Sequence, residues 1–293
     1  MEVFSFSFNS MGCLWNIRIW DDIDSHKKEH LQSYIKKATD DFDKKYSRFI
    51  DDSLVLSRLR SSGEYSVPED LVHMLKHYKN LYLHTDKKFT PLVGQILSDL
   101  GYDQNYSLKP KEALSVVPEF EHAIEIIDAH TIRINEPILL DLGGLGKGYW
   151  VDKIRGFLRS SGLKIFLVDG SGDMFFQSND NRNIIVGLEH PYDPSKVVGT
   201  ISLSNKALCG SGANKRSWRG IHHIIDPFAL KSTDSIIASW VMADTTVYAD
   251  ALATCLFLIS PEKLKKIYSF EYLILGKDMS AKYSKGFNVE IFS

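Results

Sequence analysis

The chain has 293 residues, of which 44% are hydrophobic and 25% are charged, a composition typical of ordinary globular proteins. Its 35 basic and 37 acidic residues give a formal net charge of −2, so the composition gives no indication of a surface for nucleic acid. No apolar run approaches the roughly 20 residues that a membrane-spanning helix requires, and we expect no transmembrane segment.

The first half of the chain contains the hydrophobic patterns of both strands and helices. Alternating apolar residues predict strand pairs, and apolar residues three or four apart predict amphipathic helices. A polar, proline-containing stretch between them predicts a surface loop. In chain order, the expected elements are strands over 3–8 and 14–20, helices over 31–46, 68–82 and 96–100, a loop over 109–118, and strands over 123–127 and 131–134.

The second half is mostly of strand type, with two helices. We interpret Gly210-Ser211-Gly212 as a turn, and we expect Thr245 or Thr246 to cap the last helix. Strand pairs outnumber βαβ units, so the predicted class is α+β rather than a doubly wound parallel sheet. The expected elements are strands over 138–140, 165–168, 184–188, 197–203, 207–209, 222–226, 235–242 and, as the terminal strand, 272–275, with helices over 151–158 and 247–259.

A glycine-rich segment, residues 141–148, links the predicted strand over 138–140 to the helix that follows. Backbone N–H groups at the start of a helix can bind an anion, and the segment also contains Lys147. The glycine spacing matches neither a Walker A loop nor a dinucleotide-binding GxGxxG motif. Two interpretations therefore stay open: a phosphate or nucleotide site, and a tight turn that needs glycine only for its dihedral angles.

Asp250 and Thr254 lie four residues apart on the last predicted helix, so their side chains share one face. Their neighbours are small or apolar, and a carboxylate is costly to bury there without a partner or a cation. A carboxylate and a hydroxyl suit a hard ion such as Mg²⁺. The alternative is an aspartate favoured by the helix dipole and a threonine bonded back to its own helix.

Two further features concern catalysis and location. His222 and His223 precede Asp226-Pro227, and a histidine at this position is either a base near neutral pH or a structural residue. The three cysteines are an odd number without metal-binding spacing, which favours a reducing compartment over a set of disulfides. The chain begins without a secretory pattern, so we expect a cytoplasmic protein or a mature form whose leader was removed.

Three blocks of sequence together resemble one family. Residues 140–152 are similar to the block DLGGIAKGYAVD, residues 223–227 to HIIDP, and residues 249–254 to ADALAT. Weaker similarities occur at residues 11–12, 53–59, 89–94 and 210–212, in the same order along the chain. This pattern resembles the ApbE family of FAD:protein FMN transferases.

The resemblance implies a single domain over residues 1–293, with a two-lobed fold of mixed and antiparallel sheets flanked by helices and an FAD site between the lobes. It implies Mg²⁺-dependent transfer of FMN from FAD to a threonine or serine hydroxyl of an acceptor flavoprotein, with release of AMP. The partners expected from it are FAD and an acceptor with an exposed flavinylation motif.

The resemblance also assigns roles to individual residues. Asp250 and Thr254 would bind Mg²⁺ through side-chain oxygens and Gly144 through its carbonyl group, and His223 would activate the acceptor hydroxyl. The residues expected to contact FAD are Met11, Phe49, Thr90, Pro91, Leu92, Asp141, Lys147, Ser211 and Ile225.

This chain departs from the family pattern around the expected flavin and adenosine pocket. Cys13 replaces a threonine, Thr90 and Leu92 replace an acid and a threonine, and Asn214 replaces an aromatic residue. Residues 228–230 replace an RTG tail. Two other functions stay open: a metal-dependent FAD pyrophosphatase, which would use the same chemistry with water as acceptor to give FMN and AMP, and a non-catalytic flavin carrier, which the altered pocket residues suggest.

Overall fold

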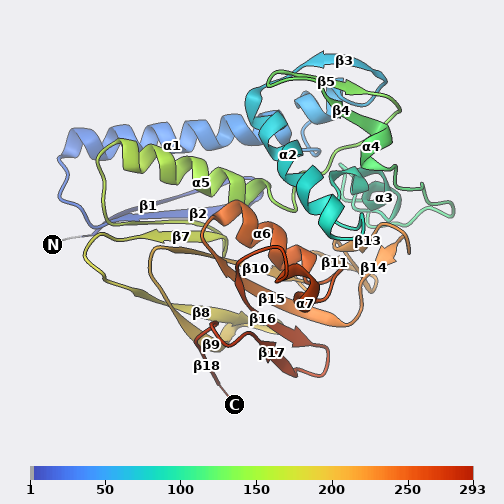
Figure 1. The fold of residues 1–293 in the computed structure, drawn as a ribbon. Helices are drawn as coiled ribbons and strands as arrows, with labels where there is room; N and C mark the ends of the chain where they lie inside the picture. Colours follow the sequence, from blue (N-terminus) through green and yellow to red (C-terminus); the bar gives the residue numbers. More distant parts are fainter. Residues whose placement is uncertain (1–2, 293) are drawn as a thin grey trace.

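The computed structural model describes residues 3–292, and its largest element is an antiparallel sheet of eight strands (Figure 1). Its strand order is β1-β2-β6-β7-β10-β15-β16-β17. The strands are β1 (Phe4–Ser10), β2 (Cys13–Ile19), β6 (Phe166–Gly170), β7 (Met174–Gln177), β10 (Lys206–Gly212), β15 (Ile236–Ala243), β16 (Glu271–Gly276) and β17 (Ala281–Tyr283).

Three helices cover one face of this sheet. They are α1 (Ser25–Tyr46), α5 (Gly146–Ser160) and α6 (Thr246–Cys255), and Figure 1 shows α1 and α5 side by side above the strands. Apolar side chains recur at helical spacing along α1 and α5 and meet inward-facing residues of the strands in the main hydrophobic core. Helix α6 is buried on nearly every side, which is why its sequence is apolar almost throughout.

The opposite face of the large sheet is covered by a small antiparallel sheet in the order β18-β9-β8. Its strands are β8 (Ile184–His190), β9 (Asp193–Leu203) and β18 (Val289–Ile291), and Figure 1 shows them below the large sheet, on the side away from α1 and α5. A second hydrophobic cluster, which includes Leu188, Ile201 and Trp240, fills the space between the two sheets. The molecule thus has a layer of helices, a layer of eight strands and a layer of three strands.

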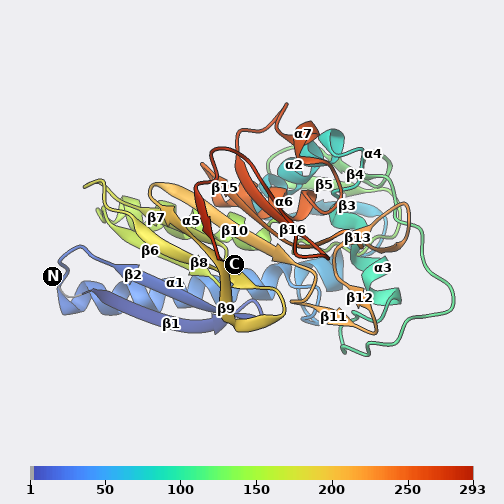
Figure 2. The ribbon, with the colours of Figure 1, turned by 90° about the horizontal axis from the view of Figure 1, so that it is seen from below.

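A second lobe adjoins the end of the large sheet where α6 lies (Figure 1 and Figure 2). It contains α2 (Glu69–His84), α3 (Gly94–Asp99), α4 (Phe120–Ala123) and a sheet in the order β3-β5-β4 (Gly63–Ser66, Thr131–Ile134, Ile124–Ile126). Two short hairpins complete it, β11–β12 (Ser217–Trp218, Ile221–His222) and β13–β14 (Ile225–Asp226, Lys231–Ser232). The short elements are η1 (Leu54–Arg58, a π-helix), η2 (Pro91–Val93) and α7 (Pro261–Leu264).

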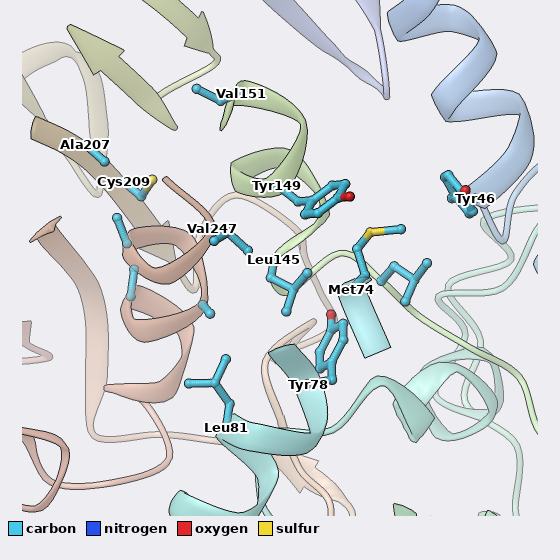
Figure 3. Close-up of a cluster of buried hydrophobic side chains, with 14 of the residues drawn as sticks. Tyr46, Met74, Tyr78, Leu81, Leu145, Tyr149, Val151, Ala207, Cys209 and Val247 are labelled. Atoms are coloured by element: carbon cyan, nitrogen blue, oxygen red, sulfur yellow. The ribbon is translucent and has the colours of Figure 1, made fainter. Parts of the chain in front are cut away.

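The main core joins the two lobes without a break. Figure 3 shows Tyr78 and Leu81 of α2, Leu145 before α5, and Val247 of α6 around one apolar space, with Cys209 of β10 beyond α6. All of these side chains are less than a tenth exposed. The hydroxyl end of Tyr78 points toward Leu145, at the glycine-rich segment (Figure 3).

Most predicted elements are confirmed, and so is the α+β class of mixed helices and antiparallel sheets. Within residues 3–292 no helix is both long and apolar enough to cross a bilayer. All three cysteines are free thiols, in agreement with the absence of a disulfide pattern. The expectation of a single domain over residues 1–293 stays a prediction.

Several local predictions were wrong. Residues 138–140 are buried but form no strand, because no other strand among residues 3–292 pairs with them: Ile138 and Leu140 pack in the main core, and a Cβ atom on Gly94 would lie 2.3 Å from the carbonyl oxygen of Leu139. Gly210-Ser211-Gly212 is not a turn but the end of β10, paired with β15. Residues 222–226 form two short strands rather than one, and β17 and β18 follow the strand expected to be terminal.

Candidate active site

Helices α5 and α6 meet at the glycine-rich segment. The backbone N–H of Gly148 donates a 2.8 Å hydrogen bond to Oδ2 of Asp250, which is 5% exposed. A Cβ atom at position 148 would lie 2.3 Å from the carbonyl oxygen of Thr246, so the close approach requires glycine. The Asp152 carboxylate of α5 accepts hydrogen bonds from the N–H groups of Thr246 and Val247 at 3.1 and 2.9 Å.

The start of α6 is therefore capped differently from the prediction. Thr245 does occupy the N-cap position, but its side chain makes no capping hydrogen bond. The oxygen atoms come from Asp152, which lies 94 residues earlier in the chain than Thr246. Asp152 thus places the first turn of α6 against α5 and satisfies two N–H groups that lack a partner within the helix.

Thr254 lies one turn beyond Asp250 on α6. Its Oγ1 atom is 3.2 Å from Oγ of Ser211 on β10, on the face of the sheet that α6 covers. The hydroxyl of Ser239 on β15 donates a 2.7 Å hydrogen bond to the carbonyl group of Ala253. Two hydroxyl groups from the sheet therefore fix the turn of α6 that carries Thr254.

Lys147, in the first turn of α5, forms a buried ion pair with Asp173, which directly precedes β7. Asp173 is 1% exposed, and its Oδ1 atom has no hydrogen-bond partner among residues 3–292. Burial raises the pKa of Asp250, and the Asp173 carboxylate raises it further, although Lys147 acts in the opposite direction. Two buried carboxylates thus share the charge of one lysine.

Asp141 forms an ion pair with Arg48, which follows the end of α1. Nε of Arg48 is 2.6 Å from Oδ2 of Asp141, and Arg48 is 4% exposed. Burial would raise the pKa of Asp141, but Arg48, the Gly143 N–H and Arg216 together lower it below its ordinary value. The other oxygen of Asp141 accepts the N–H of Gly143 at 2.8 Å, and the guanidinium lies over the rings of Phe49 and Tyr102.

Gly144 is held from the side of α2. Its N–H donates a 3.2 Å hydrogen bond to the hydroxyl group of Tyr78, and the Tyr78 ring stacks on Phe89. A Cβ atom at position 144 would lie 3.0 Å from the Phe89 ring. The backbone of the glycine-rich segment is therefore held at Gly143 by Asp141 and at Gly144 by Tyr78.

A cavity of about 650 Å³ opens beside this segment. It lies between the end of α1, the loop over 102–108, the glycine-rich segment and residues 214–218. Met11, Phe49, Asp141 and Lys147, four of the residues expected to contact FAD, line it. Tyr106 stacks on Phe49 with ring centres 5.1 Å apart, which gives the cavity an aromatic wall suited to a planar ring system.

A second, smaller cavity of about 70 Å³ adjoins the first. Both are lined by Tyr102, Asp141, Gly143 and Arg216, which places the two cavities side by side. The smaller one also contains most of the remaining predicted residues. These are Thr90, Gly144, His223, Ile225 and Thr254.

His223 lies in the smaller cavity with an unpaired ring nitrogen. Its Nδ1 atom is buried and has no hydrogen-bond partner within the described part of the chain. Burial lowers the pKa of His223 to about 3, with the Arg216 guanidinium as the next cause. The imidazole is therefore neutral near pH 7, the form that can accept a proton. His222, in contrast, bonds to the carbonyl group of Thr233 at 2.6 Å.

Three of the residues expected to contact FAD line neither of these two cavities. Leu92 is 1% exposed and belongs to the main core, and Pro91 contributes its carbonyl oxygen to a 2.8 Å hydrogen bond from Asp141 N–H. Ser211 lines a third cavity, of about 190 Å³, under the β8–β9 hairpin. The prediction from sequence omitted Arg48, Asp152, Asp173 and Tyr78, whose partners lie far away in the chain.

Comparison with known proteins identifies the family and the fold. The sequence profile of the ApbE family matches residues 11–273. The chain belongs to the ApbE family. The FAD:protein FMN transferase of Escherichia coli K12 is 22% identical over 291 residues, covering 93% of this chain and 83% of that protein. The enzyme of the same name from Treponema pallidum is 28% identical over 231 residues, covering 68% of this chain and 63% of that protein.

Solved structures of ApbE proteins have the same fold. The ApbE protein of Thermotoga maritima superposes with a TM-score of 0.83 at 21% identity, covering 98% of both chains. The flavin transferase ApbE of Vibrio cholerae superposes with a TM-score of 0.77 at 22% identity, also covering 98% of both chains. The fold predicted from the resemblance is thereby confirmed.

The residues expected to hold a metal suit a hard cation. Residues 3–292 contain no group of three or more histidine, cysteine, aspartate or glutamate side chains placed to bind a metal. The expected ligand set is of another kind, with one carboxylate, one hydroxyl and one backbone carbonyl. Asp250 and Asp173 place two carboxyl groups beside Lys147, and Thr254 and Ser211 add neutral oxygen atoms. Carboxylate, hydroxyl and carbonyl oxygens are the kind of ligand that Mg²⁺ takes.

Proposed function

We propose that this ApbE-family protein is an FAD:protein FMN transferase. It would move FMN from FAD to a threonine or serine hydroxyl of an acceptor flavoprotein in a Mg²⁺-dependent reaction that releases AMP. The observation that carries the proposal is the placement of Thr254 and His223 in one cavity, with Asp250 one helical turn from Thr254. The names of the relatives support the same class of enzyme, a transferase.

The larger cavity would hold the flavin nucleotide. Its volume of about 650 Å³ is within the range of small-molecule sites, and Phe49 and Tyr106 offer flat apolar surfaces to a ring. The diphosphate would lie toward the glycine-rich segment, near Lys147. Asp250 and Thr254 would bind Mg²⁺ by side-chain oxygens and Gly144 by its carbonyl oxygen. The metal would supply positive charge to the diphosphate.

His223 would act on the acceptor. A serine or threonine hydroxyl is a poor nucleophile, and a neutral imidazole within reach can take its proton as the oxygen attacks the phosphorus of the FMN half. A bond forms between that oxygen and phosphorus, the bond to the bridging oxygen of the diphosphate breaks, and AMP leaves with the electron pair. The free, buried Nδ1 atom of His223 supports this role.

The test supplies every reactant. The protein is incubated with FAD, Mg²⁺ and an acceptor domain carrying an exposed Asp-x-x-Ser/Thr-Gly-Ala-Thr-like segment, and AMP and covalently bound flavin are measured. We expect both products in equal amounts. AMP without labelled acceptor would identify a pyrophosphatase, and binding of FAD without any AMP would identify a carrier.

Two variants test the roles of the metal ligand and the base separately. We expect Asp250→Asn to lower turnover at least a hundredfold. Asp244→Asn is the matched control, because Asp244 precedes the same helix but is exposed and pairs with Lys206, whereas Asp250 is buried against α5. For His223→Ala we expect slow transfer with unchanged FAD affinity, and loss of FAD binding would assign His223 to the pocket instead.

A further inference from the structure

Arg216 occupies the junction of the two cavities. It lines both the larger and the smaller one, together with Asp141 and Gly143 of the glycine-rich segment. A Cβ atom on Gly143 would lie 4.0 Å from Nη1 of Arg216, so the guanidinium lies directly over that glycine. The Arg216 backbone is fixed as well, because its carbonyl oxygen accepts the N–H of His223 at 3.2 Å.

The other cationic side chains of these cavities are already paired with carboxylates. Arg48 pairs with Asp141 at 2.6 Å, Lys88 with Asp226 at 2.7 Å, Lys215 with Glu189 at 2.6 Å, and Lys147 with Asp173. The side chain of Arg216, in contrast, makes no hydrogen bond or ion pair with any of residues 3–292. Its positive charge is thus available to a ligand.

The charge of Arg216 acts on the groups expected to carry out the chemistry. It lowers the pKa of Asp141, Asp250 and His223, in each case as a smaller contribution than burial. These contributions agree with the place of Arg216 beside Gly143, at the junction of the two cavities. The diphosphate of FAD carries two negative charges, and Lys147 lines the same larger cavity as Arg216.

We propose that Arg216 binds the diphosphate of FAD and stays bound to the phosphate of AMP as it leaves. The proposal rests on the proposed function for its substrate. The planar guanidinium can donate hydrogen bonds to two phosphate oxygens at once, which a lysine ammonium cannot do with the same fixed geometry. Because the Arg216 side chain is paired with no carboxylate in the described part of the chain, no ion pair has to break before it binds phosphate. Arg216 would add its positive charge to those of the metal and Lys147.

The test compares ligands with and without phosphate. Affinities for FAD, ADP and riboflavin are measured by fluorescence or calorimetry with wild type, Arg216→Ala and Arg216→Lys, in EDTA so that nothing turns over. We expect Arg216→Ala to weaken FAD and ADP by about tenfold to a hundredfold, because hydrogen bonds to charged groups are strong, and to leave riboflavin unchanged. Arg216→Lys should recover part of the loss.

Arg219→Ala is the matched control. It removes the same charge from the β11–β12 hairpin; both arginines are exposed, but Arg219 lines neither cavity whereas Arg216 lines both. Unchanged FAD affinity in Arg216→Ala would overturn the proposal, and so would an equal loss for riboflavin and FAD, since that indicates a distorted pocket. Failure of wild type to release AMP from FAD with Mg²⁺ would instead count against the proposed function, whatever Arg216 does to ADP binding.

Discussion

The backbone N–H of Gly148 donates to Oδ2 of Asp250 at 2.8 Å, and this bond places a carboxylate of α6 at the start of α5. The glycine makes the bond possible, because a side chain there would overlap the backbone of Thr246. The position of the expected magnesium ligand is therefore set by packing between two helices rather than by a flexible loop.

Gly148→Ala should separate α5 from α6. A Cβ atom would lie 2.3 Å from the Thr246 carbonyl oxygen and 2.7 Å from the Asp250 Cβ atom, so we expect a loss of about 3 kcal/mol in the free energy of unfolding. Urea denaturation measures it. Gly156→Ala on the same helix is the control: nothing lies within 4 Å of its Cβ position, and we expect a gain of about 0.5–1 kcal/mol. Equal effects of the two variants would show that helix contact does not require Gly148.

Asp173→Asn should leave Lys147 without its partner. Asp173 is 1% exposed, and breaking a buried ion pair by removing one member costs about 3–5 kcal/mol, which urea denaturation would reveal. The double variant Lys147→Met with Asp173→Leu should recover part of that loss. For comparison, Asp180→Asn breaks an exposed pair with Arg182 and should not move the unfolding midpoint. A wild-type midpoint for Asp173→Asn would contradict the ion pair's structural role.

Asp152→Ala should destabilise the first turn of α6. The variant removes the acceptor for two backbone N–H groups, those of Thr246 and Val247, and the loss of a helix cap costs about 1–2 kcal/mol. Hydrogen exchange at these two amides should increase more than exchange in α1, which does not contact Asp152. Uniform acceleration across the chain would indicate general destabilisation instead of a lost cap.

His223 should make the protein sensitive to acid. Its folded-state pKa, about 3, lies below the ordinary value near 6.5, so the unfolded chain binds the proton more readily and stability falls as the pH drops below 6.5. We expect this residue to contribute a slope of about 1.4 kcal/mol per pH unit between roughly pH 6 and pH 4. His223→Asn should lack that part of the slope and match the wild-type slope above pH 7.5. Urea titrations at a series of pH values provide the comparison.

The local elements could be predicted because the spacing of apolar residues within each segment indicates whether it is a strand or a helix. The alternation in β1 and β2 and the helical spacing in α1, α2 and α5 each depend on one buried face. The apolar run at residues 138–140 was misinterpreted because burial of an irregular segment in the main core requires the same apolar composition as burial in a sheet. The glycines of β10 were taken for a turn, although a Cβ atom on Gly210 would lie 3.0 Å from the ring of Trp240.

The supporting residues of the site could not be found this way. Arg48 and Asp141 are 93 residues apart, and Lys147 and Asp173 are 26 residues apart. No local pattern in the sequence relates such pairs, since only the folded chain brings them into contact. Asp250 and Thr254 could be found from the sequence because both lie on one helix, where spacing alone predicts that they share a face. Asp173 closes the turn Asp-Gly-Ser-Gly-Asp and resembles a surface residue by every local criterion.

The anchoring of α6 from two sides limits how this chain can change length during evolution. Asp250 is bonded to α5 and Thr254 to β10, so both contacts require the ten residues of α6 to keep their positions relative to α5 and β10. One residue inserted into α6 between its start and Asp250 would rotate both side chains by about 100° around the helix axis, which would break the Asp250 bond to Gly148 and move Thr254 out of the smaller cavity. The exposed loop over 109–118, in contrast, can gain or lose residues without altering these positions. Divergence among relatives should therefore include insertions in that loop and none within α6.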